Sequence, residues 1–277
     1  MNPNRVVIVT GAGGTGCGRA IAARFAKDGA SVIVSDVNEA GGQETVHLIQ
    51  REGGRAAFFH ADVRDEQQVR NLIAFGDRSG SGSMVLVNNA SAPFRPGEPL
   101  EHWMDTIQTD LTGALHATQY AIDAMRCRGG GAIVNIASIS ALWHGRRHGG
   151  GAPAYDVAKA GLIRLTTTLD WLGEKENIRV NCLAPGWIAT DGPRQYWESL
   201  TPAERAERGV PSTLLSVDNV ASAVVRLATD ESLAGRVLVW WSDDAPRFIA
   251  NGDRGYERYD EELSKRFQTA IGRPSNG

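Results

Sequence analysis

Short apolar runs alternate with longer amphipathic segments along almost the whole chain. The runs that favour strands cover residues 5–10, 31–36, 56–61, 84–88, 132–138, 178–183 and 236–240. The segments typical of helices include residues 18–28, 39–52, 66–78, 100–126, 155–173 and 217–229. Most runs are continuously apolar, as expected of parallel strands buried on both faces of a sheet. The alternation therefore predicts an α/β fold with one doubly wound, parallel sheet of about seven strands and helices on both faces.

No linker or low-complexity segment interrupts this alternation before residue 250. We therefore expect a single Rossmann-type domain over residues 1–250, with its ligands beyond the carboxyl ends of the strands. Residues 251–277 form a charged tail, in which one helix is expected around residues 256–267. Residues 141–153, ALWHGRRHGGGAP, differ from the rest as a glycine-rich, basic loop between a strand and a helix.

Charge and composition limit the classes of function. The 277 residues carry 29 basic and 32 acidic side chains, a net charge of −3 that offers no footprint for nucleic acid or an anionic membrane. No apolar stretch approaches the ~20 residues that span a bilayer, and the amino end lacks the pattern of a signal peptide. Cys17, Cys127 and Cys182 are too scattered for a disulfide framework, and the histidines show no ligand-spaced pair with an organised carboxylate. We expect a cytoplasmic protein with reduced thiols, no metal and a small-molecule partner.

A glycine cluster joins the first predicted strand to the first predicted helix. It reads Thr10-Gly11-Ala12-Gly13-Gly14-Thr15-Gly16-Cys17-Gly18. Glycines let the backbone approach a pyrophosphate, and the helix N-terminus adds free N–H groups and a positive dipole end. Asp36 ends the second predicted strand about 20 positions after Gly16. A carboxylate at this place can bind an adenosine ribose and would repel a 2′-phosphate. No Arg or Lys occupies the glycine cluster or directly follows Asp36, so the sequence favours NAD over NADP.

At these motifs the chain resembles the short-chain dehydrogenase/reductase family, and the resemblance extends over residues 6–239. The family's TGxxxGxG motif is matched with one extra residue between Gly11 and Gly16. HADV at residues 60–63 resembles the segment that reaches the adenine amino group through its aspartate, and NNAS at residues 88–91 resembles the family's NNAG turn. LAPGWIAT at residues 183–190 resembles the segment that holds the nicotinamide carboxamide. Together these motifs predict cofactor contacts by Gly11, Gly16, Gly18, Asp36, Asp62, Val63, Asn88, Ala90, Tyr155, Lys159, Pro185, Gly186, Ile188 and Thr190.

Tyr155 and Lys159 stand four positions apart at the start of a predicted helix, so they share one face of it. An ammonium beside a phenol favours the phenolate form. Such a tyrosine can accept the proton of an alcohol during oxidation, or return it to a carbonyl compound during reduction. The pair lies between a VNIAS strand and a VNCLAPG strand, as it does in the family that the chain resembles. We predict that Tyr155 is the general acid/base.

The resemblance also implies two further catalytic positions. A serine follows the strand VNIAS at Ser138, and its hydroxyl is expected to hold the substrate oxygen; Ser140 is the alternative, since an insertion in the following basic loop can shift the register. The family's helical asparagine, in its NLxG segment, is matched by Asp110 in DLTG. An aspartate there would keep the local kink and add a negative charge near Lys159. The predicted catalytic set is Ser138, Tyr155, Lys159 and Asp110.

Substrate recognition is expected in residues 187–210, a predicted lid after the sixth strand, and in the basic loop. The lid residues Trp187, Tyr196 and Trp197 offer an aromatic surface for an apolar or ring-shaped substrate, with packing inside the lid as the alternative. The loop residues that could bind an acidic group are His144, Arg146, Arg147 and His148, although a solvated loop is favoured.

The last predicted strand ends differently from the VDGG-like turn of the family. It runs into Trp240 and Trp241, two tryptophans expected at a sheet edge, which favour a subunit interface. Because the family is commonly dimeric or tetrameric, we expect a homo-oligomer.

Two functions are consistent with these residues. The first is an NAD-dependent oxidoreductase that transfers a hydride between a secondary alcohol or ketone and a nicotinamide cofactor. The alternative is a non-catalytic NAD-responsive binding or regulatory protein on the same fold, which the altered glycine loop and Asp110 would suit. Retention of the serine, tyrosine and lysine favours the enzyme.

Overall fold

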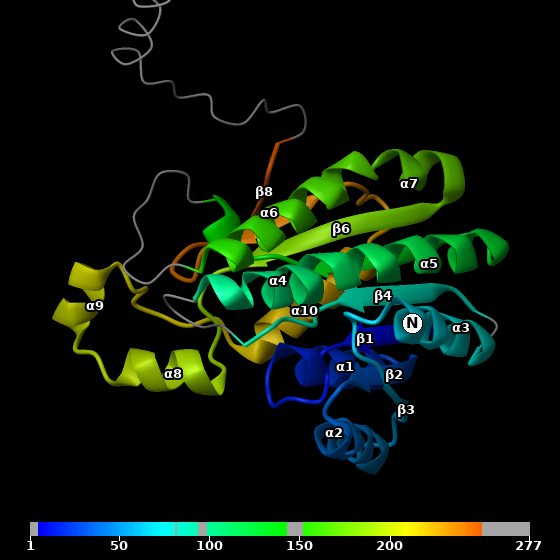
Figure 1. Ribbon diagram of the computed structural model, residues 1–277, viewed down its shortest axis with the longest axis horizontal. Helices are drawn as coiled ribbons and strands as arrows, with labels where there is room; N and C mark the ends of the chain where they lie inside the picture. Colours follow the sequence, from blue (N-terminus) through cyan, green and yellow to red (C-terminus); the bar gives the residue numbers. More distant parts are fainter. Residues whose placement is uncertain (1–4, 81, 94–98, 143–151, 251–277) are drawn as a thin grey trace, which may run out of the picture.

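The computed structural model describes residues 5–80, 82–93, 99–142 and 152–250. The predicted tail helix and most of the basic loop, with its histidines and arginines, lie outside these residues. One sheet crosses the molecule with helices on both faces (Figure 1), which confirms the predicted α/β, Rossmann-type fold. Its strands are β1 (Val6–Thr10), β2 (Ser31–Asp36), β3 (Arg55–His60), β4 (Met84–Asn88), β5 (Gly131–Ile136), β6 (Ile178–Pro185), β7 (Val237–Trp240) and β8 (Arg247–Phe248).

The strand order is β3-β2-β1-β4-β5-β6-β7-β8. The first seven strands are parallel, as predicted, whereas the two-residue β8 pairs antiparallel with β7 and makes the sheet eight-stranded. A two-residue strand has no hydrophobic period, so the sequence pattern could not indicate it. The last strand of the sheet is therefore β8 rather than the predicted strand that ends at Trp240, although β8 pairs with Leu238 and Val239, just before the two tryptophans.

Helices on the two faces of the sheet form separate apolar layers. One layer contains α1 (Cys17–Lys27), α2 (Glu39–Arg51) and α10 (Val217–Thr229); the other contains α3 (Glu66–Arg78), α4 (Trp103–Ile107), α5 (Gly113–Cys127), α6 (Pro153–Thr168) and α7 (Trp171–Glu176). Successive side chains of β1 alternate between the layers: Val7 and Val9 pack with the α1 and α10 cluster, and Val6 and Ile8 with the α3 and α5 cluster. Burial on both faces explains why this strand is continuously apolar.

The predicted helix over residues 100–126 is helical throughout but not uniform. A 3₁₀ turn, η1 (Leu100–His102), precedes α4, and a π-helical turn, η2 (Gln108–Thr112), separates α4 from α5. Asp110 lies in the middle of this π turn. Such turns inside α-helices are frequent at functional sites, because they redirect side chains that a regular helix would place elsewhere.

Two other helical segments differ from the sequence prediction. The predicted helix over residues 155–173 starts earlier, at Pro153, whose ring suits the first position of a helix. It ends at Thr168 and is followed by the separate α7. The predicted lid contains α8 (Asp191–Glu198) and α9 (Pro202–Arg208), which project from one end of the molecule in Figure 1.

Parallel pairing brings the carboxyl ends of β1 to β7 to one edge of the sheet, where α8 also begins. The chain order reverses between β1 and β4, and a crevice for ligands forms at such a switch point.

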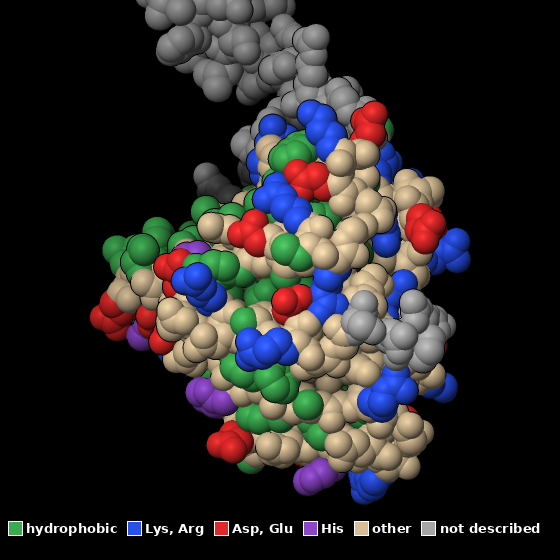
Figure 2. Space-filling view, turned by 90° about the vertical axis from the view of Figure 1, so that its right-hand side faces the viewer, with side chains coloured by type: hydrophobic (Ala, Val, Ile, Leu, Met, Phe, Trp, Pro, Cys, Tyr) green, Lys and Arg blue, Asp and Glu red, His purple; other side chains and the backbone are tan. Residues whose placement is uncertain are grey.

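The right-hand side of the molecule in Figure 1, opposite α8 and α9, is shown in Figure 2. Among the described residues of this face, basic and acidic side chains are interspersed and form no patch of a single charge sign. No helix in the described part of the chain is both long enough and apolar enough to cross a membrane.

Candidate active site

The glycine cluster forms a tight loop between β1 and α1. Gly11 has φ +67°, and a Cβ on it would lie 2.6 Å from Cα of Ala90, which follows β4. A Cβ on Gly18 would lie 2.2 Å from the Gly11 carbonyl oxygen. Neither position therefore accepts a side chain without moving backbone. Gly16, the N-cap of α1, carries no capping side chain and leaves this helix N-terminus open.

Asp36 contacts the glycine loop directly. Its Oδ2 accepts a hydrogen bond from the backbone N–H of Gly13 at 2.7 Å, and its Oδ1 accepts one from Asn38 at 2.9 Å. A carboxylate oxygen has two lone-pair sites, so each oxygen keeps one site for a further donor. The position of Asp36, at the carboxyl end of β2 and against the loop, is the one expected for a ribose-binding carboxylate.

A cavity of about 280 Å³ lies beside Asp36 and extends past the end of β3. Asp62 and Arg64 both line it, and Arg64 makes a bidentate ion pair with Asp62 in which one N–O distance is 2.6 Å. Hydrogen bonds from Arg64 hold the pKa of Asp62 below its ordinary value. Asp62, predicted to reach the adenine amino group, is thus already occupied by Arg64. Arg64 was not among the sequence-predicted site residues, because it follows β3 and belongs neither to the glycine cluster nor to the residues directly after Asp36.

The turn after β4 is attached to the end of β1. The Thr10 hydroxyl accepts hydrogen bonds from the backbone N–H groups of Asn89 and Ala90, both at 3.1 Å, and the Asn89 amide donates to the Thr10 and Gly11 carbonyls. Ala90 therefore lies next to the glycine loop, as its predicted role requires. Asn88 differs, because its side chain turns into the core.

Asn88 belongs to a buried polar network. Its amide donates to Asn135 on β5 at 2.8 Å and to Thr118 on α5 at 3.1 Å, and Asn135 donates to Thr166 on α6 at 3.0 Å. These bonds join two strands to two helices beneath the site, and they satisfy groups that water cannot reach. Because the side chain of Asn88 is engaged in this network, the predicted cofactor contact would have to come from its backbone.

The segment after β6 begins the lid. A Cβ on Gly186 would lie 2.6 Å from the Ser242 hydroxyl, so this glycine allows the end of β6 to approach the turn after β7. Ile188 pairs with Leu215, so in the structure the lid comprises residues 187–215, and this pair joins its two ends. Thr190 is the N-cap of α8, and a Cβ on Gly16 would lie 3.3 Å from its methyl group. The lid therefore starts in contact with the glycine loop.

Tyr155, Lys159 and Ser138 come from α6 and from the end of β5. The Lys159 ammonium lies 5.3 Å from the centre of the Tyr155 ring and donates to the Ile136 carbonyl at 3.2 Å. Ser138 follows Ile136 by two residues, and its hydroxyl oxygen accepts a hydrogen bond from the Ser140 N–H. The lysine thus connects the tyrosine to the backbone that carries the serine. Ser140, the alternative, has a buried hydroxyl oxygen without a hydrogen-bond partner among the described residues.

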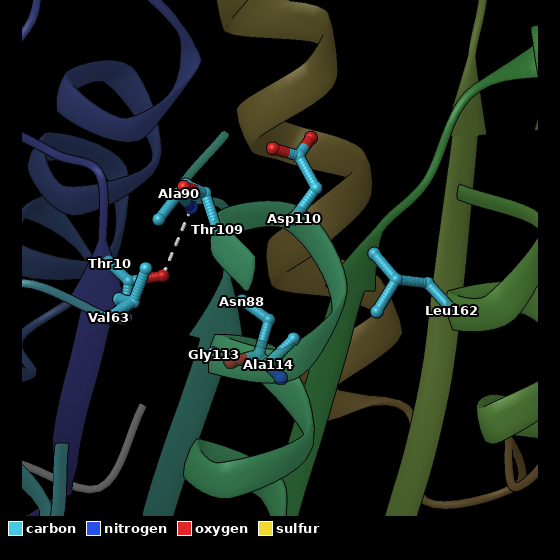
Figure 3. A pocket seen from close by; sticks show the side chains of 9 residues that line it. All are labelled: Thr10, Val63, Asn88, Ala90, Thr109, Asp110, Gly113, Ala114 and Leu162. Carbon is cyan, nitrogen blue, oxygen red and sulfur yellow. Dashed lines mark hydrogen bonds between the residues drawn. The ribbon is translucent and has the colours of Figure 1, made fainter. Parts of the chain in front are cut away.

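Asp110 forms a fully buried ion pair with Lys159. Its Oδ2 lies 3.1 Å from the ammonium, and side-chain exposure is 0% for the aspartate and 3% for the lysine. The Ser91 hydroxyl donates to Oδ2 at 2.5 Å, and the Ala92 N–H donates to Oδ1 at 2.7 Å. Figure 3 shows Asp110 on its helical turn, with Ala90 and Thr10 to one side and Leu162 to the other. A buried carboxylate is tolerated here because an ammonium and two donors surround it.

Ser91 and Asp110 are two departures from the family pattern that meet in space. Ser91 replaces the glycine of the NNAG turn, and its added hydroxyl bonds the carboxylate that replaces the asparagine. The sequence showed each departure separately, but no spacing rule linked them, because residues 91 and 110 belong to different elements.

Aromatic side chains of the lid have two different roles. The rings of Trp187 and Tyr196 stack with their centres 6.0 Å apart, and 43% of Tyr196 is exposed. The Trp197 ring instead packs inside the lid, under the Arg205 guanidinium, and its Nε1 donates to the Pro211 carbonyl. Trp187 and Tyr196 therefore form a stacked pair with an exposed tyrosine, whereas Trp197 stabilises the lid.

The turn after β7 fixes the lid to the sheet, a function that sequence reasoning did not assign to it. The Ser242 hydroxyl accepts from the Trp187 N–H at 2.7 Å. The Asp243 carboxylate accepts from the N–H groups and hydroxyls of both Ser212 and Thr213, at 2.8–2.9 Å. Desolvation acts to raise the pKa of Asp243, but these hydrogen bonds outweigh it and the pKa lies below its ordinary value.

The residues present fit a dinucleotide. The loop offers an uncapped helix N-terminus for phosphates, Asp36 offers free acceptor sites for ribose hydroxyls, and the cavity beside it is lined by Asp62 and Ala90. Burial raises the pKa of the Cys17 thiol, at the start of α1, to about 11, so it adds no negative charge there. All three cysteines are free. No group of three or more potential metal ligands occurs within the described ranges.

Comparisons with known proteins agree with this geometry. Residues 5–200 match the family model described as short chain dehydrogenase. An uncharacterized oxidoreductase of Thermotoga maritima is 36% identical over 69% of this chain and 73% of its own length. L-rhamnose 1-dehydrogenase (NAD(P)(+)) of Azotobacter vinelandii is 36% identical over 82% of this chain and 90% of its own. A short-chain dehydrogenase/reductase structure from Burkholderia xenovorans superimposes with a TM-score of 0.75 at 32% identity, over 87% of this chain and 95% of that one.

Proposed function

Because the chain belongs to the short-chain dehydrogenase/reductase family, whose dehydrogenases use a nicotinamide cofactor, we propose that it is an NAD-dependent oxidoreductase acting on a secondary alcohol or the corresponding ketone. The observation that carries the proposal is the position of Lys159, which lies beside the Tyr155 ring and donates to the backbone two residues before Ser138. Three groups with complementary chemistry thus share one edge of the sheet.

Each residue has a role in this reaction. The Ser138 hydroxyl holds the substrate oxygen; the Tyr155 phenolate accepts the alcohol proton in oxidation, and the phenol donates that proton in reduction. Lys159, anchored by Asp110 and the Ile136 carbonyl, keeps a positive charge beside the phenol. The nicotinamide supplies the acceptor or donor of hydride. Because a proton and a hydride leave the alcohol together, the product is the carbonyl compound.

Preference for NAD rests on Asp36, whose carboxylate would repel a 2′-phosphate. Arg64 lines the same cavity but is paired with Asp62, so its charge is largely neutralised. The rhamnose dehydrogenase relative carries both cofactors in its name, which makes NADP the necessary control.

The stacked rings of Tyr196 and Trp187 suit a ring-shaped or apolar substrate. We also propose that the protein is cytoplasmic and forms a homo-oligomer, either a dimer or a tetramer. Light scattering would measure the mass of the assembly and distinguish the two.

The first test follows NADH absorbance with secondary alcohols of several classes, from sugars and steroids to hydroxy acids, with NADP in parallel. We expect turnover with NAD on one class. Tyr155→Phe should reduce kcat by about 10²–10⁴-fold, the usual contribution of an acid/base group, while NADH binding persists. Tyr120→Phe, which removes a phenol that bonds Glu66 away from the site, is the matched control and should retain activity.

Three results would change the proposal. Equal turnover in Tyr155→Phe would exclude the tyrosine as acid/base. Turnover with NADP alone would overturn the role given to Asp36. NAD binding without turnover on any alcohol would favour the alternative, a non-catalytic NAD-responsive protein.

A further inference from the structure

The glycine loop and the lid are joined by a side-chain hydrogen bond. The Thr15 hydroxyl donates to Oδ2 of Asp191 at 2.8 Å, although 176 positions separate the two residues. Thr15 belongs to the stretch of the loop that is one residue longer than the family motif. The longer loop therefore makes a contact with the lid that involves a charged group.

Asp191 is held at this position by the backbone. It is the first residue of α8, directly after Thr190, whose methyl group lies against Gly16. The lid behind it is joined at its ends by Ile188 and Leu215, and Ser242 binds the lid at Trp187. The carboxylate is thus fixed beside the loop rather than carried there by a long, mobile side chain.

The charge of Asp191 opposes the chemistry of the loop. The N-terminus of α1 has no acidic residue in its first turn, its N-cap is a glycine, and the adjacent Cys17 thiol is neutral. Such a terminus attracts anions. Asp36 bonds the loop at Gly13, on the side of β2, whereas Asp191 bonds it at Thr15, on the side of the lid. An anionic diphosphate bound to the loop would meet the Asp191 carboxylate.

We propose that Asp191 limits the affinity of the protein for dinucleotides, because its carboxylate repels the diphosphate and competes with it for the Thr15 hydroxyl. The inference rests on the proposed function, since it requires a dinucleotide at the glycine loop. A residue that weakens binding favours release of the spent cofactor, a step that limits turnover in many enzymes. Asp191 is an affinity-determining residue in this scheme and does not touch the substrate.

The test is fluorescence titration of NADH, and separately of NADPH, into wild type, Asp191→Asn and Asp191→Ser. Both variants remove the charge but keep a residue suited to the first turn of a helix. We expect binding to tighten about two- to fivefold, the size of one charge interaction at a helix terminus, and the gain to shrink at high potassium chloride. Glu198→Gln is the matched control, because it removes a carboxylate from the opposite end of the same helix.

Each outcome is decisive. Tightening in both Asp191 variants but not in Glu198→Gln supports the inference. Equal tightening in all three would show a general charge effect and overturn it. Unchanged or weaker binding in the Asp191 variants, with normal binding by wild type, overturns this inference alone; weaker binding would mean that the bond holds the lid over the cofactor. Failure of wild type to bind either dinucleotide overturns the proposed function as well.

Discussion

The cluster around Asp110 and the lid are held by different kinds of contact: one is a buried ion pair, the other a set of exposed hydrogen bonds. The side chains of Asp110 and Lys159 are shut off from solvent, and the carboxylate is paired on both oxygens. The lid is fixed by the exposed carboxylates of Asp191 and Asp243, where water can replace either partner. Removing one partner of the buried pair should lower the free energy of unfolding by several kcal/mol, because a charge is left without a partner. Removing one partner of an exposed hydrogen bond should lower it much less. The difference suits the proposed function, in which the chemistry at Tyr155 and Lys159 needs fixed geometry and the lid opens for exchange of ligands.

The largest expected effect comes from breaking the buried ion pair. Asp110→Ala leaves the Lys159 ammonium buried without its counter-charge and removes the acceptor of the Ser91 and Ala92 donors. We expect the free energy of unfolding to fall by about 3–5 kcal/mol, measured by urea denaturation. Asp105→Ala, an exposed aspartate on the preceding helix, is the control and should cost less than about 0.5 kcal/mol. If Asp110→Ala and Asp105→Ala lowered the free energy of unfolding by equally small amounts, the buried ion pair would not be more important for stability than an exposed contact.

An intermediate effect is expected where the lid meets the sheet. Asp243→Asn weakens the acceptor of four hydrogen bonds, and because the group is exposed we expect a loss of about 1 kcal/mol near pH 7. The pKa of Asp243 is depressed in the folded protein, so its stabilisation is present above the unfolded pKa and is lost as pH falls through the folded pKa. The two proteins should therefore become equally stable in acid.

Urea denaturation at neutral and acidic pH checks this prediction. Asp244→Asn is the neighbouring control, because Asp244 contributes its backbone carbonyl to Trp240. A stability gap between wild type and Asp243→Asn that stays constant down to about pH 2 would show that the charge of Asp243 is not what fixes the lid.

The smallest expected effect on global stability is at the start of α9. Thr201 and Glu204 form a capping box, and Thr201→Ala should destabilise that helix locally by about 1 kcal/mol. Hydrogen exchange should therefore quicken in α9 with little change in the unfolding midpoint. Ser216→Ala makes the same kind of change at the cap of the core helix α10 and should lower the midpoint. Similar global losses in both variants would mean that the lid unfolds together with the core.

Much of the candidate site could be predicted because its residues stand at strand ends. Asp36 and Ser138 end runs whose apolar pattern identifies buried strands, and Pro185 follows such a run. Parallel pairing places all three at one edge of the sheet. Tyr155 and Lys159 are four positions apart on a helix, which fixes their shared face. The capping box of α9 was also present in the sequence, as Thr201-Pro202-Ala203-Glu204, and the C′ glycine Gly209 follows it. These residues are thus a local signal for the start and the end of α9.

Contacts between distant elements could not be predicted in the same way. The contact of Thr15 with Asp191 depends on the path of the longer glycine loop, and the one between Asp243 and Ser212 depends on where the lid returns to the sheet. The occupation of Asp62 by Arg64 depends on a side-chain rotamer. No periodicity encodes any of these: the first two need the relative placement of segments far apart in the chain, and the third needs one rotamer of a long side chain.

The sequence by itself determined the layers, the order of elements and the edge of the sheet at which chemistry is expected, since apolar period and glycine position act locally along the chain. Only the tertiary structure decided that the π turn directs Asp110 onto Lys159, that Ser91 completes that pair, and that two carboxylates fix the lid. The physical reason is the separation along the chain of the residues that interact. A hydrophobic period is set by neighbours within a few residues, whereas a buried charge is stable only where several distant donors converge on it.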